Sequence, residues 1–126
     1  MRTGEIVIHG KRYPMRMTLG ATKAIAKLSQ KLKDNVGDEV DVFIKMLEIL
    51  IYQGCAYKNL FESDLPVLED AAYQDGKYIP ISADEIEIAL DGGAEGIEVI
   101  RNAVMQVILD GNQTNVGTKS KTKTKN

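Results

Sequence analysis

Histidine and cysteine are nearly absent from this chain of 126 residues, which has one of each, His9 and Cys55. A single cysteine cannot form an internal disulfide bond, and neither residue has nearby partners that would complete a metal site or a nucleophile–base pair. We therefore interpret His9 as an exposed turn residue and Cys55 as a buried, inert thiol. The carboxylates also match no calcium-binding loop. The sequence thus predicts a protein that is not an enzyme and needs no metal or cofactor.

Long apolar runs and a secretory signal are also missing. The longest apolar run, Met46 to Ile51, is interrupted by Glu48 and is far shorter than the roughly 20 residues that cross a bilayer. The N-terminus lacks the basic, then apolar, then small-residue pattern of a signal peptide. The sequence therefore favours a cytosolic protein without a membrane partner, and its length is typical of one domain.

Charge, by contrast, is abundant and sorted into three blocks. Residues 1–33 contain eight Lys or Arg and one Glu, residues 34–110 contain seventeen acidic and four basic residues, and the last sixteen add four lysines. The formal net charge of −2 hides this separation. Opposite fields at two ends of a small protein steer its association with a complementary partner or with another copy of itself.

The first structural pattern is a β-hairpin over Glu5 to Met17, where apolar and polar residues alternate on both sides of a turn at residues 9–11. Pro14 cannot donate a ladder hydrogen bond, so its strand should lie at a sheet edge. A lone hairpin is marginal in water. We therefore expect helices to cover one of its faces.

Helical periodicity predicts those helices over residues 20–33, from 39 to at least 53, from a capping box at Ser82 and Glu85 to about 91, and over 94–110. The fold class is α+β, an N-terminal β-hairpin packed on a mainly α-helical bundle of about four helices. Two local alternatives stay open. Residues 85–88 also alternate as a strand would, and Asp75-Gly76 is either a hairpin turn or part of an irregular excursion.

The chain ends in a polar segment. Gly111 should close the last helix, and residues 111–126 alternate Lys with Thr or Ser and contain no aromatic residue. Such a segment cannot offset its ordering entropy by burial. The sequence thus predicts a single domain over residues 1–110 followed by a disordered tail over 111–126.

The central helix, from residue 39, is apolar over most of its circumference. Beside its core stripe, Val42, Met46 and Ile49 form a second apolar strip. A helix of this kind is either central in its fold or buried by another chain. The second strip is therefore a candidate partner-binding surface.

A set of cations is the other candidate surface. Lysines recur every four residues on the first helix, and two arginines lie on the polar face of the hairpin; the five are Lys23, Lys27, Lys31, Arg12 and Arg16. They form either a partner-binding surface or an ordinary solvated face. The acidic pI of about 5.4 and the lack of aromatic residues among the cations argue against nucleic acid as the partner.

The hairpin over residues 5–17, followed at once by Gly20-Ala21 and an alanine-rich helix, resembles the opening of tail assembly chaperones from long-tailed bacteriophages. The similarity continues to residue 110 as an order of elements, with a central apolar helix and a closing apolar helix. Residues 62–81 have no counterpart in it.

This resemblance implies a non-enzymatic protein that coats the tape measure protein in the host cell cytoplasm and is absent from the mature virion. It also implies self-association, as a helical or open oligomer, and in many such families a longer frameshifted form. The cations and the second strip of the central helix would then be the contact surfaces. The alternatives are a structural tail component, such as a terminator or connector subunit, and a small nucleic-acid-binding regulator.

Overall fold

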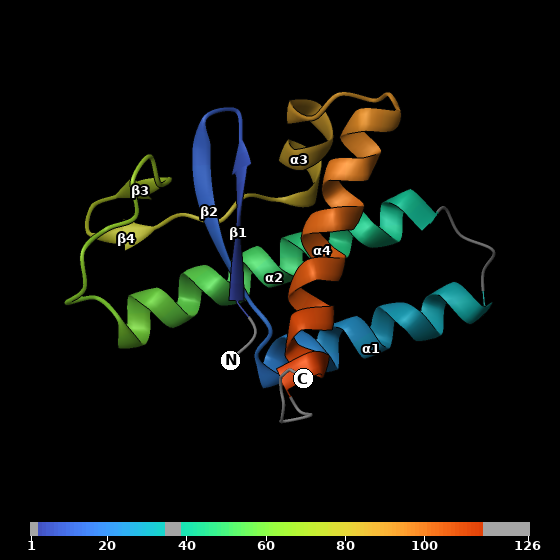
Figure 1. Ribbon diagram of the computed structural model, residues 1–126, viewed down its shortest axis with the longest axis horizontal. Coiled ribbons are helices and arrows are strands. Elements are labelled where there is room, and N and C mark those ends of the chain that lie inside the picture. The colour runs from blue at the N-terminus through green and yellow to red at the C-terminus, as the bar shows by residue number, and fades with distance from the viewer. Residues whose placement is uncertain (1–2, 35–38, 115–126) are drawn as a thin grey trace.

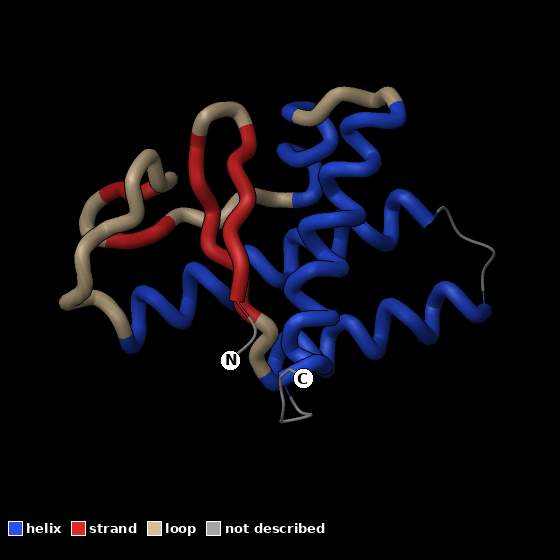
Figure 2. The backbone as a smooth tube through the Cα atoms, viewed as in Figure 1, coloured by secondary structure: helices blue, strands red, loops and turns tan. Residues whose placement is uncertain are grey.

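The computed structural model describes residues 3–34 and 39–114 and has an α+β fold (Figure 1, Figure 2). A β-hairpin packs on four helices, as the sequence predicts, and a second, smaller hairpin lies beside it. In chain order the elements are β1 (Thr3–Ile8), β2 (Lys11–Arg16), α1 (Leu19–Asp34), α2 (Glu39–Phe61), β3 (Tyr73–Gln74), β4 (Lys77–Tyr78), α3 (Ala83–Ala89) and α4 (Ala94–Thr114).

The first hairpin turns in two residues. His9 and Gly10 have φ angles of 52° and 77°, and two successive positive φ values are typical of a type I′ turn, whose twist matches that of the flanking strands. Lys11, which we expected in the turn, already pairs with Ile8. His9 is exposed, as predicted.

The hairpin is a two-stranded sheet, so the prediction that Pro14 lies on an edge strand is confirmed. Farther along the same edge, the Arg12 amide donates to the Asp70 carbonyl (2.8 Å) and the Ala72 amide donates to the Arg12 carbonyl (3.4 Å). This bridge ties the loop before β3 to the hairpin, and it covers part of the edge that β2 would otherwise expose.

Helix α2 is the central element and contacts both hairpins, α1, α3 and α4 (Figure 1). It ends at Phe61, two turns beyond the shortest extent that the sequence predicts. Its buried residues join side chains of β1, β2, α1, α3 and α4 in one hydrophobic core, whose fully buried members include Ile8, Leu47, Leu50, Ile51, Ile86, Val104 and Val107. The sequence also predicts an N-cap for this helix at Asp38, one residue before Glu39. Asp38 lies outside the described residues.

The segment between α2 and α3 contains the second hairpin. Asp75 and Gly76 have φ angles of 54° and 80° and form its turn, so the hairpin alternative is confirmed. The Asn59 side chain fixes this hairpin to α2, since it accepts from the Tyr78 amide (2.9 Å) and donates to the Tyr78 carbonyl (3.2 Å). The Tyr78 hydroxyl accepts in turn from the Leu68 amide (3.0 Å).

The last two helices follow the sequence pattern with one correction. Residues 85–88 are helical, and the capping box at Ser82 and Glu85 is present. The prediction that Gly111 closes α4 is wrong, because α4 continues to Thr114. A glycine inside a helix costs only about 1 kcal/mol relative to alanine, which does not by itself end a helix. The predicted tail beyond residue 114 lies outside the described residues.

Candidate partner-binding surface

Helix α2 carries an apolar stripe that its own chain leaves uncovered. Ile49, Tyr52, Ala56 and Leu60 are spaced by three or four residues and therefore share one face of the helix; we call them the α2 stripe. Tyr52 is 57% exposed and Leu60 is 73% exposed, whereas Ile49 is half-buried. Ala56, between Tyr52 and Leu60, is half-buried.

The position at which α1 begins explains why Ile49 is less exposed than Tyr52 and Leu60. The Thr18 hydroxyl accepts from the Ala21 amide (3.0 Å), as an N-cap does, and it donates to the Gln53 side-chain oxygen (2.6 Å). Helix α1 therefore begins beside Gln53 and runs back along the first half of α2 (Figure 1). Beyond Gln53, none of the helices within residues 3–34 and 39–114 covers this face of α2 (Figure 1).

A groove of about 490 Å³ opens at the inner end of the α2 stripe. Its floor is α2, one wall is α1, and the other wall is the segment that leads into α3. Its apolar lining consists of Ala24, Ile49, Tyr52, Pro80 and Ile81. The groove and the stripe share Ile49 and Tyr52, so together they make one continuous apolar area, which we call the α2 surface.

Carboxylates line the α3 side of the groove. Glu48 accepts from the Ala83 amide (2.8 Å) and so joins α2 to the first turn of α3. Glu85 accepts from the Ser82 amide (3.0 Å) and the Ser82 hydroxyl (3.0 Å). These hydrogen bonds lower the pKa of Glu85 below its ordinary value. Both carboxylates are thus held in place as negative charges at the groove.

Lysines lie on the opposite side. Lys27 is one turn from Ala24 on α1 and therefore flanks the groove, and Lys23 precedes Ala24. Both side chains are exposed, and among the described side chains neither forms an ion pair. Lys31 continues the same row on α1, but its side chain lies outside the described part of the structure. The groove itself is thus lined by two carboxylates and by no lysine of the described residues, and the lysines of α1 lie outside its lining.

The two predicted arginines have internal partners instead. Arg12 pairs with Glu5 (3.1 Å) and donates to the Glu69 carbonyl (3.1 Å). The Arg16 guanidinium stacks 3.5 Å from the centre of the Tyr57 ring and lies 3.8 Å from Glu62. Both contacts tie β2 to neighbouring elements. The exposed part of the predicted basic surface is therefore the lysine row of α1.

The predicted strip of Val42, Met46 and Ile49 is only partly available. All three side chains are half-buried, and Met46 and Ile49 pack against the core. The exposed residues of the same face are Tyr52 and Leu60, farther along the helix. Sequence analysis placed the helix from residue 39 to at least 53 and ended the strip at Ile49, although the same spacing continues from Ile49 through Tyr52 to Leu60.

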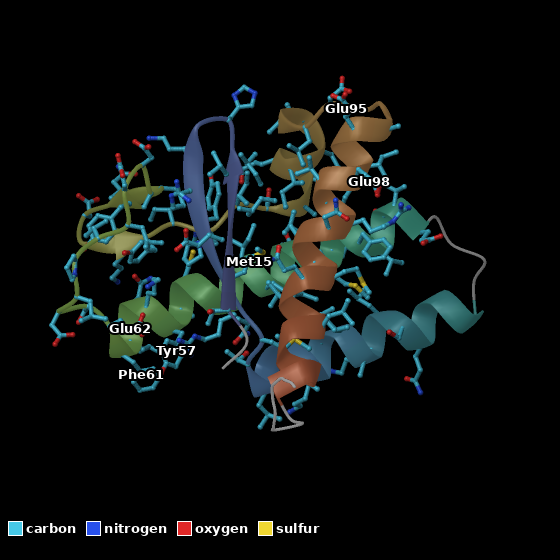
Figure 3. All side chains as sticks on the ribbon, in the orientation of Figure 1. Met15, Tyr57, Phe61, Glu62, Glu95 and Glu98 are labelled. Atoms are coloured by element: carbon cyan, nitrogen blue, oxygen red, sulfur yellow. The ribbon has the colours of Figure 1, made fainter. Side chains whose placement is uncertain are left out.

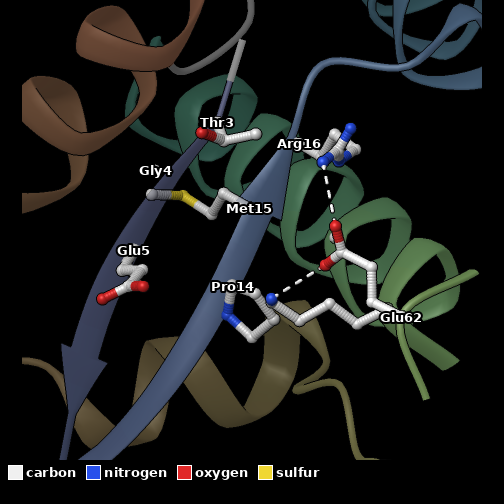
Figure 4. A pocket seen from close by; sticks show the side chains of 9 residues that line it. Thr3, Gly4, Glu5, Pro14, Met15, Arg16 and Glu62 are labelled. Atoms are coloured by element: carbon white, nitrogen blue, oxygen red, sulfur yellow. Dashed lines mark hydrogen bonds and ion pairs between the residues drawn. The ribbon is translucent and has the colours of Figure 1, made fainter. Parts of the chain in front are cut away.

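The polar cavity beside the hairpin is a structural junction. It encloses about 360 Å³ between β1, β2 and the end of α2. There Glu62 accepts from Lys58 (3.0 Å) and lies near Arg16 (Figure 4). One carboxylate thus pairs with two cations, and the group stabilises the packing of β2 on α2.

The prediction that Cys55 is buried is confirmed. Cys55 is 2% exposed, and burial raises its pKa from the ordinary 9.0 to about 11. Within residues 3–34 and 39–114 no three His, Cys, Asp or Glu side chains come together as a metal site would require. Nor does any helix in these ranges combine the length and the hydropathy that a bilayer-crossing segment needs.

Exposed acids gather at the end of the molecule that α3 and α4 share. Glu95 and Glu98 lie on the first turns of α4, away from α1 (Figure 3). Other exposed acids near this end are Asp84, Glu87 and Asp91. These acids lie away from the lysines of α1, whereas Arg16 of the basic N-terminal block pairs with Glu62 of the acidic block. Comparison with known proteins found no matching family model, no matching curated protein and no similar solved structure.

Proposed function

We propose that this protein is a tail assembly chaperone of a long-tailed bacteriophage, which covers the tape measure protein in the host cell cytoplasm without any enzymatic step. The resemblance of residues 4–110 to such chaperones supports this proposal. The observation that carries it is the α2 surface, an apolar area on a rigid central helix that ends in an open groove.

The shape of the α2 surface suits a helical client. Contiguous apolar area on a soluble protein typically marks an interaction site. A groove floored by one helix and flanked by another accepts an amphipathic helix, whose apolar side chains recur every three or four residues. A tape measure protein, being long and largely helical, would present many such stripes. Covering them would keep the client soluble until the tail tube forms.

The charge distribution suits a coat that must later be removed. The lysines of α1 and the acids of the α3–α4 end lie at different places on the molecule. Copies that line up along a client would bring such opposite charges together, and exposed ion pairs are weak and sensitive to salt. Electrostatic contacts of this kind speed assembly more than they tighten it.

Co-expression with the tape measure protein tests this proposal. The wild-type chain should keep the tape measure protein in the soluble fraction and elute with it. Leu60→Asp should abolish this effect, because the change places a charge within the apolar contact. Val99→Asp is the matched control, since Val99 is an exposed residue of α4 (44% exposed) outside the α2 surface; it should behave as wild type.

Two results would overturn the proposal. One is a tape measure protein that is equally soluble with and without the chain. The other is recovery of the chain in stoichiometric amounts from purified virions by mass spectrometry, which would make it a structural tail component.

A further inference from the structure

The groove of the α2 surface continues onto α3. Glu85, Ile88 and Ala89 are spaced by three or four residues and therefore share one face of that helix. Together with Ile81 and His9 they surround a second hollow of about 370 Å³. Because Ile81 and Glu85 also line the groove, the two spaces join across these residues. We call the joined space the trough; it has apolar side chains on both sides of Glu85.

The described residues that line the trough include two carboxylates, Glu48 and Glu85, and no Lys or Arg. Hydrogen bonds from the Ala83 amide and from Ser82 hold these carboxylates in place. Among the described side chains neither carboxylate forms an ion pair. Glu48 is half-buried, and a charge in such a place attracts an opposite charge more strongly than one surrounded by water.

The lysines of α1 do not take the place of a cation in the trough. Lys23 and Lys27 lie outside its lining and are exposed, so solvent and salt screen them. A cation that a client brought into the trough would lie directly beside Glu48 and Glu85. The trough therefore offers a positively charged group an apolar and negatively charged environment.

Lys and Arg side chains combine the two properties that such an environment requires. Their aliphatic stems pack on apolar side chains while their charged heads reach a polar partner. Here a stem would lie over Ile49 and the exposed ring of Tyr52, which is one turn from Glu48. The face of an aromatic ring also attracts a cation. Ile88, which is 84% exposed, would contact the apolar residues next to that cation in the client.

We propose that the trough preferentially binds client helices in which a Lys or Arg interrupts the apolar stripe, and that Glu48 and Glu85 determine this preference. The inference rests on the proposed function, because it specifies which segments of the client the protein covers. A stripe with an acidic residue at that place would be disfavoured, since like charges would meet inside the contact.

Three synthetic peptides test the preference with the full chain. Each is an amphipathic helix of about five turns with a leucine stripe, and the three differ only in one central residue beside the stripe, which is Lys, Gln or Glu. Isothermal titration calorimetry measures each dissociation constant. The Lys peptide should bind at least about tenfold more tightly than the Glu peptide, with the Gln peptide between them. Added salt should reduce the difference.

Glu48→Gln tests the source of the preference. The amide oxygen of Gln can still accept from the Ala83 amide, so the substitution removes the charge and retains the hydrogen bond. It should lower the affinity ratio of the Lys and Glu peptides by at least about threefold. Glu95→Gln is the matched control, because Glu95 is exposed on α4 outside the trough; it should keep the wild-type ratio.

Two further variants complete the test. Glu48→Gln combined with Glu85→Gln should bring the three peptides to nearly equal affinity; if loss of the α3 cap unfolds this double variant, the single variant decides. Tyr52→Ala should weaken binding of the Lys peptide by at least about threefold, whereas Val99→Ala should not. Equal affinity for the three peptides, no binding of any peptide, or binding that Tyr52→Ala leaves unchanged would each overturn the inference.

The outcomes separate this inference from the proposed function. A chain that keeps the tape measure protein soluble but binds the three peptides equally would refute the charge preference and leave the chaperone function intact. A chain that prefers the Lys peptide through Glu48 but has no effect on the tape measure protein would do the reverse.

Discussion

Arg16 shows how a residue with the sequence features of a surface cation is used inside the fold. Its side chain is 13% exposed, stacked on Tyr57 and close to Glu62. Charge and spacing place Arg16 on the polar face of the hairpin, and this was the basis for treating it as a contact residue. Its partners come from α2, far along the chain, so no local pattern identifies them. Lys23 and Lys27 of α1 are exposed, and neither forms an ion pair among the described side chains.

Gly54 is a residue whose importance depends on a neighbour from another element. A Cβ atom at this position would lie against the Pro14 carbonyl oxygen and 2.8 Å from the Met15 Cα. We predict that Gly54→Ala lowers the free energy of unfolding by about 1–3 kcal/mol, because β2 must move away from α2. Urea denaturation measures the change. Gly92→Ala is the control, since a Cβ there meets nothing within 4 Å; equal stability of the two variants would contradict the account.

Cys55 should be protected from thiol reagents by the fold. Its pKa of about 11 leaves very little thiolate near pH 8, and its burial blocks access. We predict slow reaction with Ellman's reagent in the native protein and rapid, complete reaction in denaturant. Above pH 9 the unfolded thiol ionises before the folded one, so stability should fall there. Fast labelling of the native protein would show that Cys55 is not buried.

At the scale of elements, α2 illustrates both the reach and the limit of sequence reasoning. Its apolar periodicity predicts a helix and its core stripe, and Ile44, Leu47, Leu50 and Ile51 are indeed buried. Gly54 has the features of a helix end, yet α2 continues through it to Phe61. A glycine is needed at this position because β2 lies too close to α2 for a Cβ atom. One face of the C-terminal half of α2 is exposed because α1 begins beside Gln53. That starting point depends on the Thr18 contact with Gln53.

The capping box of α3 was predictable because both of its partners lie within four residues. It also gives a prediction about pH. The lowered pKa of Glu85 means that its ionised form stabilises the fold above its ordinary pKa of 4.5, and that this contribution is lost as the pH falls through the lowered value. Glu85→Gln should therefore be less stable than wild type at neutral pH, and the two should converge in acid.

Urea denaturation at several pH values measures this convergence. Glu87→Gln is a suitable control, because Glu87 is exposed on the same helix but outside the capping box. A constant difference between Glu85→Gln and wild type from neutral to acidic pH would show that the ionised carboxylate has no special role in the cap.

At the scale of the whole molecule, the α+β class and the separation of charge follow from the sequence. The groove does not, because its second wall depends on the path of residues 62–81. That path is fixed by contacts such as the Asn59 side chain on Tyr78 and the Arg12 backbone on Asp70 and Ala72. These partners are distant in sequence. The position of Pro80 and Ile81 beside α1 is therefore a property of the assembled fold.

The central claim is that the α2 surface binds the tape measure protein. Site-specific photo-crosslinking tests this claim most directly. A benzophenone amino acid would replace Leu60 or, as the control, Val99, in cells that produce both proteins. We predict a covalent adduct with the tape measure protein from position 60 and none from position 99. Adducts from position 99 alone, or from neither position, would contradict the claim.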